Sequence, residues 1–164
     1  MESLNYCISE YTGQLRKGII QKAYKGIISF MSKLKKYIGD KHPEYSPGSL
    51  YMGHMDMTYF AITPMELKNR SLKIAIVYLH EQNRIEIWLC GSNRKIQSEY
   101  IRYFGNKKID GYKLSQAEPG VDSIIESLIV EQPDFDNADE LMKIIEEKTV
   151  EFANQIVSLL HKGT

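Results

Sequence analysis

Residues 72–90 read LKIAIVYLHEQNRIEIWLC, and this stretch decides the fold. Two runs rich in β-branched and aromatic residues flank a short polar segment, which is typical of two β-strands joined by a tight turn. Side chains alternate between the two faces of a strand, so the pairing register decides which residues share a face. If the numbers of two paired residues add up to an even value, Val77 pairs with Ile87 and one face is wholly apolar; this is the even register. If they add up to an odd value, Val77 lies opposite Glu86; this is the odd register. We therefore predict the even register.

The predicted turn comprises residues 81–83, and Asn83 is suited to the left-handed conformation that such a turn requires. The second face of the hairpin then combines aromatic and charged groups. A face of this kind can bind a small ligand or a partner segment. An equally good interpretation is that a helix covers this face and that Arg84 and Glu86 pair with each other at the edge of the helix. The candidate ligand-binding residues on this face are Tyr78, Arg84, Glu86 and Trp88.

Composition limits the class of protein. The chain of 164 residues is 43% hydrophobic and 26% charged, which fits one globular domain. The formal net charge is zero, which argues against a nucleic-acid or anionic-membrane partner. Cys7 and Cys90 lie far apart, as in a reduced, cytoplasmic protein. Neither a signal peptide nor an apolar run of the ~20 residues needed to cross a membrane is present in the sequence.

Hydrophobic spacing predicts the order of elements. The core order is α-β-β-β-α-β, which indicates an α+β fold with a three- to four-stranded, mostly antiparallel sheet flanked by helices. One strand–helix–strand crossover suggests that the sheet is mixed. The predicted helices are 3–17, 20–38, a short helix of one or two turns that begins with the capping box at 63–66, 94–104, 121–130 and a long C-terminal helix at 137–161. The predicted strands are 50–62, the two hairpin strands and a weak strand near 108–114.

The two long helices are expected to pack together through their apolar stripes. The helix at 20–38 is basic and the one at 137–161 is acidic, so their packing would bring lysines near glutamates. If the chain left the far end of the C-terminal helix uncovered, a homodimer through that helix would be the better interpretation. The residues concerned are Lys33, Lys35 and Lys36, Glu140, Glu147 and Glu151, and the apolar Phe152, Ile156 and Leu160.

The α-β-β-β-α-β order resembles the core of restriction-endonuclease-like nucleases. That family carries an Asp on its second strand and Glu-x-Lys on its third, which together hold Mg²⁺. Here the third strand has Glu86 but Trp88 at the lysine position, and the second strand has no Asp. The alternative function is therefore a metal-assisted hydrolase or nuclease with a degenerate site, in which Asp56 and Glu86 would share a cation.

Two further clusters are candidate binding groups. His54 and Asp56 lie two residues apart, so they share a strand face and could contact one ligand, although two groups do not define a metal site and we predict no metal. Ser92, Asn93 and Arg94 lie at the start of a helix, where backbone N–H groups bind anions. Ordinary capping by Ser92 or Asn93 explains the same residues.

Several stretches resemble an uncharacterised family of bacterial cytoplasmic proteins known only as a domain of unknown function. They are KG at 17–18, QKAYK at 21–25, MDMTYF at 55–60, LKIAIV at 72–77, EIWL at 86–89, G at 91 with NRK at 93–95, GVDSIIE at 120–126 and PDF at 133–135. The resemblance implies a bacterial protein with a single stand-alone domain, but no activity, cofactor or catalytic residue.

The sequence does not decide whether the protein is an enzyme. It contains no complete catalytic or cofactor-binding constellation, and this favours a non-enzymatic binding domain with no cofactor that recognises a small ligand or a protein partner. A protein partner could also contact charged helix faces such as the acidic stretch at 131–151.

Overall fold

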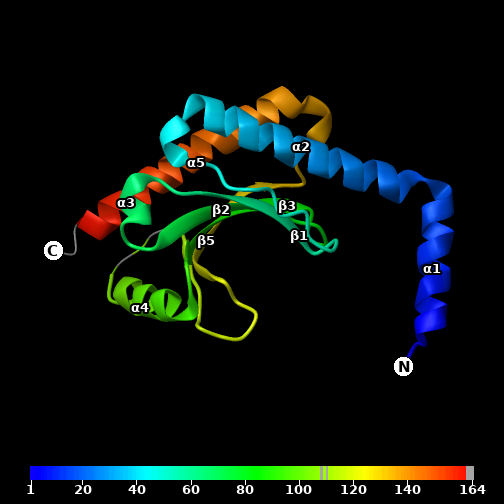
Figure 1. Ribbon diagram of the computed structural model, residues 1–164, viewed down its shortest axis with the longest axis horizontal. Coiled ribbons are helices and arrows are strands. Elements are labelled where there is room, and N and C mark those ends of the chain that lie inside the picture. The colour runs from blue at the N-terminus through cyan, green and yellow to red at the C-terminus, as the bar shows by residue number, and fades with distance from the viewer. Residues whose placement is uncertain (108, 110, 162–164) are drawn as a thin grey trace.

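The computed structural model describes residues 1–107, 109 and 111–161, and it contains an antiparallel sheet of order β1-β2-β3-β5-β4 (Figure 1). The α+β class is confirmed. The strands are β1 (Met57–Ile62), β2 (Leu72–Leu79), β3 (Arg84–Gly91), β4 (Lys113–Leu114) and β5 (Ser123–Glu131). The helices are α1 (Leu4–Lys17), α2 (Ile19–Lys41), α3 (Met65–Lys68), α4 (Arg94–Gly105) and α5 (Ala138–His161), with 3-10 turns at Pro43–Tyr45 and Phe135–Asn137.

Helices α2 and α5 lie side by side over one face of the sheet, as their apolar stripes predict (Figure 1). Leu34 and Ile38 from α2 meet Ile156 from α5 in a core whose other side is formed by strand residues such as Ile76 and Ile87. All of these side chains are buried. Burying an aliphatic side chain of this size contributes about 1.5–3 kcal/mol, so the stripes dominate the energy of this packing.

The far end of α5 is covered within a single chain. Phe152, Ile156 and Leu160 are buried, so the condition that would favour a homodimer through α5 is not met. The predicted lysine–glutamate pairs between α2 and α5 are not formed by the described residues. Instead, Lys36 pairs with Asp40 on its own helix at 2.7 Å, and His42 Nε2 lies 2.7 Å from Glu146 Oε1 on α5.

The predicted hairpin register is wrong by one residue. Ile76 pairs with Ile87, and Val77 pairs with Glu86. The sheet still has one wholly apolar face, because the odd register aligns every second residue from Ile74 to Tyr78 with apolar partners on β3. Strand β2 is apolar on both of its faces, so its sequence alone cannot choose between the registers. The connecting turn is four residues long, at 80–83, and Asn83 takes the predicted left-handed conformation with φ 50°.

The segment predicted as a helix at 121–130 is strand β5. Its apolar residues have helical spacing because β5 bulges twice against β3. Ile85 pairs with Val130 but Glu86 with Leu128, and a second shift follows Leu89. Each bulge inserts one extra residue and interrupts the alternation that identifies a strand. Strand β5 pairs antiparallel with β3 and β4, so every strand pair among the described residues is antiparallel and the expected mixed sheet is not found.

Both edges of the sheet are short or occupied. Strand β1 begins at Met57 rather than at residue 50, and residues 48–51 run along its outer edge instead. Gly48 N donates to Ala61 O at 2.8 Å, and Tyr51 exchanges two backbone hydrogen bonds with Tyr59. The opposite edge strand, β4, has only two residues.

Helix α1 projects away from the body of the molecule (Figure 1). It is separated from α2 by Gly18, which has φ 78° and ends α1 by donating its N–H to Leu15 O at 3.0 Å. The left-handed backbone conformation at this position has no steric cost for glycine, whereas most other residues adopt it only at a cost in energy. None of the residues of α1 is buried, so this helix does not contribute to the core.

Candidate functional site

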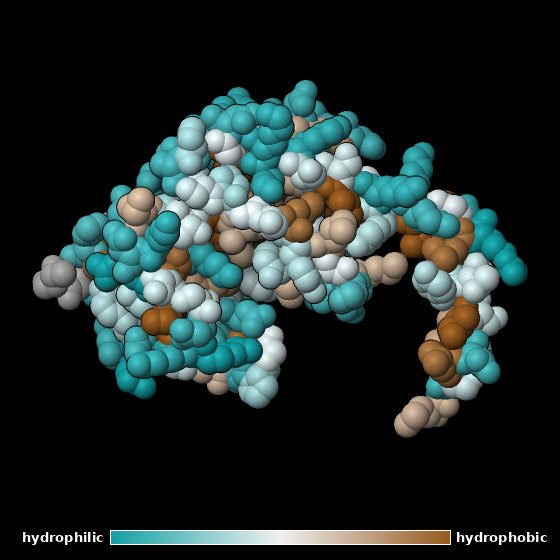
Figure 2. All heavy atoms as spheres, in the orientation of Figure 1, coloured by the Kyte–Doolittle hydropathy of each residue, from teal (hydrophilic) through white to brown (hydrophobic). Residues whose placement is uncertain are grey.

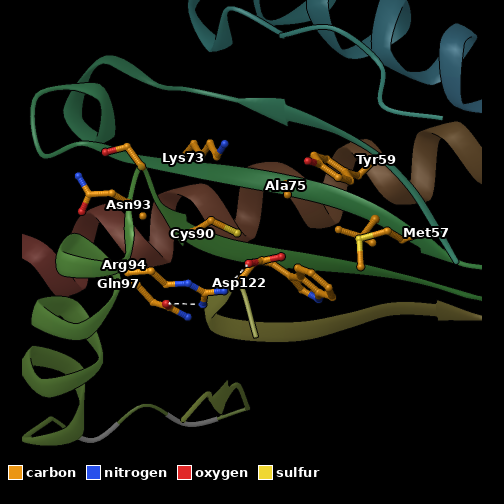
Figure 3. Close-up of a pocket in the computed structure, with 13 residues that line it drawn as sticks. Met57, Tyr59, Lys73, Ala75, Cys90, Asn93, Arg94, Gln97 and Asp122 are labelled. Carbon is orange, nitrogen blue, oxygen red and sulfur yellow. Dashed lines mark hydrogen bonds and ion pairs between the residues drawn. The ribbon is translucent and has the colours of Figure 1, made fainter. Parts of the chain in front are cut away.

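The face of the sheet opposite α2 and α5 contains a cavity of about 340 Å³ (Figure 3). Its floor is apolar and comes from three neighbouring strands: Met57 and Tyr59 on β1, Ala75 and Val77 on β2, and Trp88 and Cys90 on β3. Its polar wall comes from the start of β2, the segment from the end of β3 into α4, and the residue before β5; the residues are Lys73, Ser92, Asn93, Arg94, Gln97 and Asp122. A cavity of this size with an apolar body and a few polar groups is typical of small-molecule sites.

The start of α4 forms one end of the cavity because the helix begins directly after β3. Asn93 caps the helix by accepting a hydrogen bond from Ile96 N at 2.9 Å. The buried Gln97 donates to the carbonyl oxygens of Val121 at 2.8 Å and Ser123 at 3.1 Å. Arg94 donates to Gln97 Oε1 and to Val121 O, and it pairs with Asp122 at 3.3 Å. These contacts fix α4 to the start of β5.

Gly91 permits this close approach of α4 to β3. A Cβ atom at this position would lie 2.8 Å from Gln97 N and 2.9 Å from Ile96 Cγ2, too close for either atom. We expect Gly91→Ala to shift α4, to lower the free energy of unfolding by about 1–3 kcal/mol and to alter the cavity. Urea unfolding monitored by circular dichroism measures this change.

The matched control is Gly105→Ala, at the other end of α4. A Cβ atom there makes only an ordinary contact with Leu114 at 3.8 Å, and alanine favours a helix. This variant should be at least as stable as the wild type. Equal stability of the two alanine variants would show that the approach at Gly91 is not tight.

The cavity offers hydrogen-bond donors and a positive charge rather than a nucleophile. Burial raises the pKa of the Cys90 thiol to about 12, so the thiol is protonated at neutral pH. Burial also raises the pKa of Tyr59, which keeps its hydroxyl protonated. Lys73 is half-buried and forms no ion pair within the described part of the chain, whereas Arg94 is already paired with Asp122. Lys73 is therefore the cation best placed to meet a ligand.

The structure brings together four of the candidate residues predicted from the sequence. Trp88 and the three residues at the helix start, Ser92, Asn93 and Arg94, all line the same cavity. Lys73, Tyr59, Gln97 and Asp122 were missed. The odd register places Lys73 on the face that Ala75 shares with Trp88, so this register identifies Lys73 as a residue of the cavity.

Arg84 and Glu86 lie beside the cavity and border a second hollow of about 260 Å³. The buried Glu86 carboxylate accepts a hydrogen bond from Trp88 Nε1 at 2.8 Å. Arg84 Nε lies 2.6 Å from Glu86 Oε2, as an ion pair without hydrogen-bond alignment. Glu86 thus holds the indole ring of Trp88 in place from outside the cavity.

Tyr78 lies on the opposite face of the sheet from Trp88. Its ring packs edge-on against Phe135 at 5.6 Å between ring centroids, and its hydroxyl donates to Asn83 Oδ1 at 2.8 Å. The separation follows from the corrected register, in which Tyr78 pairs with Ile85 on the core side. Tyr78 is therefore buried by the helices rather than available to a ligand in the cavity.

His54 and Asp56 lie in the exposed loop before β1 and do not line the cavity. Asp56 Oδ1 accepts a hydrogen bond from His54 N at 2.9 Å, and such backbone hydrogen bonds lower the pKa of the Asp56 carboxyl. Strand β2 separates the β1 side of the sheet, where Asp56 lies, from Glu86 on β3. Across the described ranges, no three His, Cys, Asp or Glu side chains are arranged to hold a metal ion.

Residues 4–160 match the family model DUF7000, described as a domain of unknown function, so the chain belongs to this family. The match extends from α1 to α5 and includes every strand of the sheet. No curated protein and no solved structure matches the chain. Among the described residues, no helix combines the length and the apolar character required to span a membrane.

Proposed function

We propose that this protein is a binding domain without catalytic activity, and that the cavity on the open face of the sheet binds a small amphipathic ligand with an anionic group. The observation that carries the proposal is the cavity itself, in which an apolar floor meets Lys73, a cation with no ion pair among the described residues. The protonated thiol of Cys90 and the protonated hydroxyl of Tyr59 provide no nucleophile or general base at neutral pH.

The geometry supports an orientation for the ligand. A flat or branched apolar group would lie on Trp88, Ala75 and Val77. A carboxylate or phosphate would lie near Lys73, where the first backbone N–H groups of α4 also favour negative charge. Arg94 already pairs with Asp122 and donates to Gln97, so Lys73 is the better candidate to provide the charge.

The two cysteines are free, with Cys7 exposed and Cys90 buried. This supports the prediction of a reducing, cytoplasmic compartment, because an exposed thiol in an oxidising compartment is readily oxidised.

Trp88 is the only tryptophan in the chain and lines the cavity, so its fluorescence reports on this site alone. We expect phenylalkyl carboxylates or phosphate monoesters of graded length to change the emission saturably, and their neutral amides or alcohols to bind at least ten times more weakly. Lys73→Ala should weaken anion binding by about tenfold or more, since a hydrogen bond to a charged group contributes about 1.5–3 kcal/mol.

The matched control is Lys113→Ala, which removes an exposed lysine beside the second hollow and leaves the cavity intact. Its affinity for the same anions should equal that of the wild type. The proposal fails if the anions do not change Trp88 emission, or if the two lysine variants bind equally well.

A further inference from the structure

Helix α1 presents an apolar stripe that remains exposed among the described residues. Leu4, Ile8 and Tyr11 are 74%, 48% and 56% exposed, and Leu15 continues the stripe. Figure 2 shows hydrophobic residues on the surface of α1, which stands apart from the body. An isolated helix of 14 residues is marginal in water, so α1 needs a partner to be stable.

The spacing of the stripe identifies the geometry of the partner. Its residues are four, three and four positions apart, which is the heptad spacing of a two-helix coiled coil. When two copies of α1 run antiparallel, Leu4 of one copy meets Leu15 of the other, and Ile8 meets Tyr11. The same residues then form both sides of the contact, as a two-fold symmetric interface requires.

Charge favours the same orientation. Glu2 directly precedes the N-terminal end of α1, and Arg16 and Lys17 lie in its last turn. In the antiparallel register Glu2 of one copy lies opposite Lys17 of the other, whereas a parallel pair places the basic last turns of both copies side by side. The dipoles of the two helices also oppose each other in the antiparallel arrangement.

We propose that α1 is a dimerisation helix that pairs antiparallel with α1 of a second copy of this chain. The apolar surface continues past Gly18 through Ile19, which is 68% exposed. A large aromatic side chain buries about 150–250 Å², so we take on the order of 100 Å² for each partly exposed side chain of this surface. Each copy contributes five such side chains, so the pair buries on the order of 1,000 Å². That is about the smallest area expected of a specific interface.

The first test is the mass of the full chain in solution. Light scattering under reducing conditions should give twice the chain mass of 19.0 kDa, and reduction excludes a disulfide through the exposed Cys7. Ile8→Glu/Tyr11→Glu and Ile8→Lys/Tyr11→Lys should each give the monomer mass. Both positions are exposed in the single chain, so Trp88 emission should match the wild type and show that the sheet remains folded. A monomeric wild type, or a dimer that survives in both variants, overturns the proposal.

The second test distinguishes self-pairing of α1 from binding of α1 to another surface. Mixing the acidic and basic variants should restore the dimer mass, because Ile8 of one copy faces Tyr11 of the other and the substituted charges are opposite. Two variants that remain monomeric after mixing would contradict the antiparallel pair. Leu128→Glu, at an exposed position on β5 outside α1, is the control and should leave the wild-type dimer intact.

Discussion

Replacing Ile156 with glutamate should leave most of the chain unfolded at room temperature. Ile156 is completely buried where α5 faces the sheet and α2. The substitution removes an apolar side chain, at a cost of about 2–5 kcal/mol, and introduces a carboxyl group whose burial costs several more. The sum is comparable to the total stability of about 5–15 kcal/mol that is typical of a domain. Thermal unfolding monitored by circular dichroism, together with the recovery of soluble protein, measures the loss.

Ser158→Glu is the matched control for this variant. It introduces the same charge two residues later on α5, at an exposed position, and should change the free energy of unfolding by less than about 0.5 kcal/mol. A folded Ile156→Glu protein with the melting temperature of the wild type would mean that α5 does not pack on the sheet as the structure shows.

Stability should fall steeply above pH 9 because of Cys90. The pKa of this thiol is raised from 9.0 to about 12 by burial in the folded chain. Below pH 9 the thiol is protonated in both states, so it makes no pH-dependent contribution. Between pH 9 and 12 the unfolded chain releases the proton and the folded chain retains it, so folding loses about 1.4 kcal/mol per pH unit. By pH 11 the loss should be about 2–3 kcal/mol.

Cys90→Ala tests this prediction by urea unfolding across the pH range. At pH 7 the variant should be about 1 kcal/mol less stable than the wild type because it leaves a small void, and by pH 11 the order should be reversed. Cys7→Ala is the control, because this exposed thiol lies on α1 and its removal leaves the burial of Cys90 unchanged. The same alkaline loss in Cys90→Ala as in the wild type would assign it to other groups, such as the buried Tyr78.

Much of the fold follows from local sequence patterns. Helices α2, α4 and α5 were predicted because their apolar residues repeat along one side, and Asn93 was identified as a capping candidate. Strand β5 was missed because its two bulges hide the alternation of a strand. Its richness in β-branched residues, from Ile124 to Val130, was the signal available.

Only part of the candidate site can be predicted from the sequence, because the face on which the other residues lie depends on the pairing register of the strands. Trp88 and Asn93 could be identified from the hairpin and the helix start. Lys73 could not be identified in this way. Strand β2 is apolar on both faces, so the local sequence does not show which residues of β3 lie on the same face as Lys73. Asp122 reaches the cavity only because Gln97 and Arg94 bind the backbone before β5, and contacts between such distant positions leave no periodic pattern.

The occupied outer edge of β1 and the two-residue β4 determine how the protein can associate with other molecules. A long, unpaired edge strand is a template for adding strands from other chains, which leads to domain swapping and to amyloid. Here the backbone groups of Tyr59 are already paired with Tyr51, and β4 is too short to serve as a template. Strand addition is therefore disfavoured along the outer edge of β1 and on β4, and association is left to other surfaces such as that of α1.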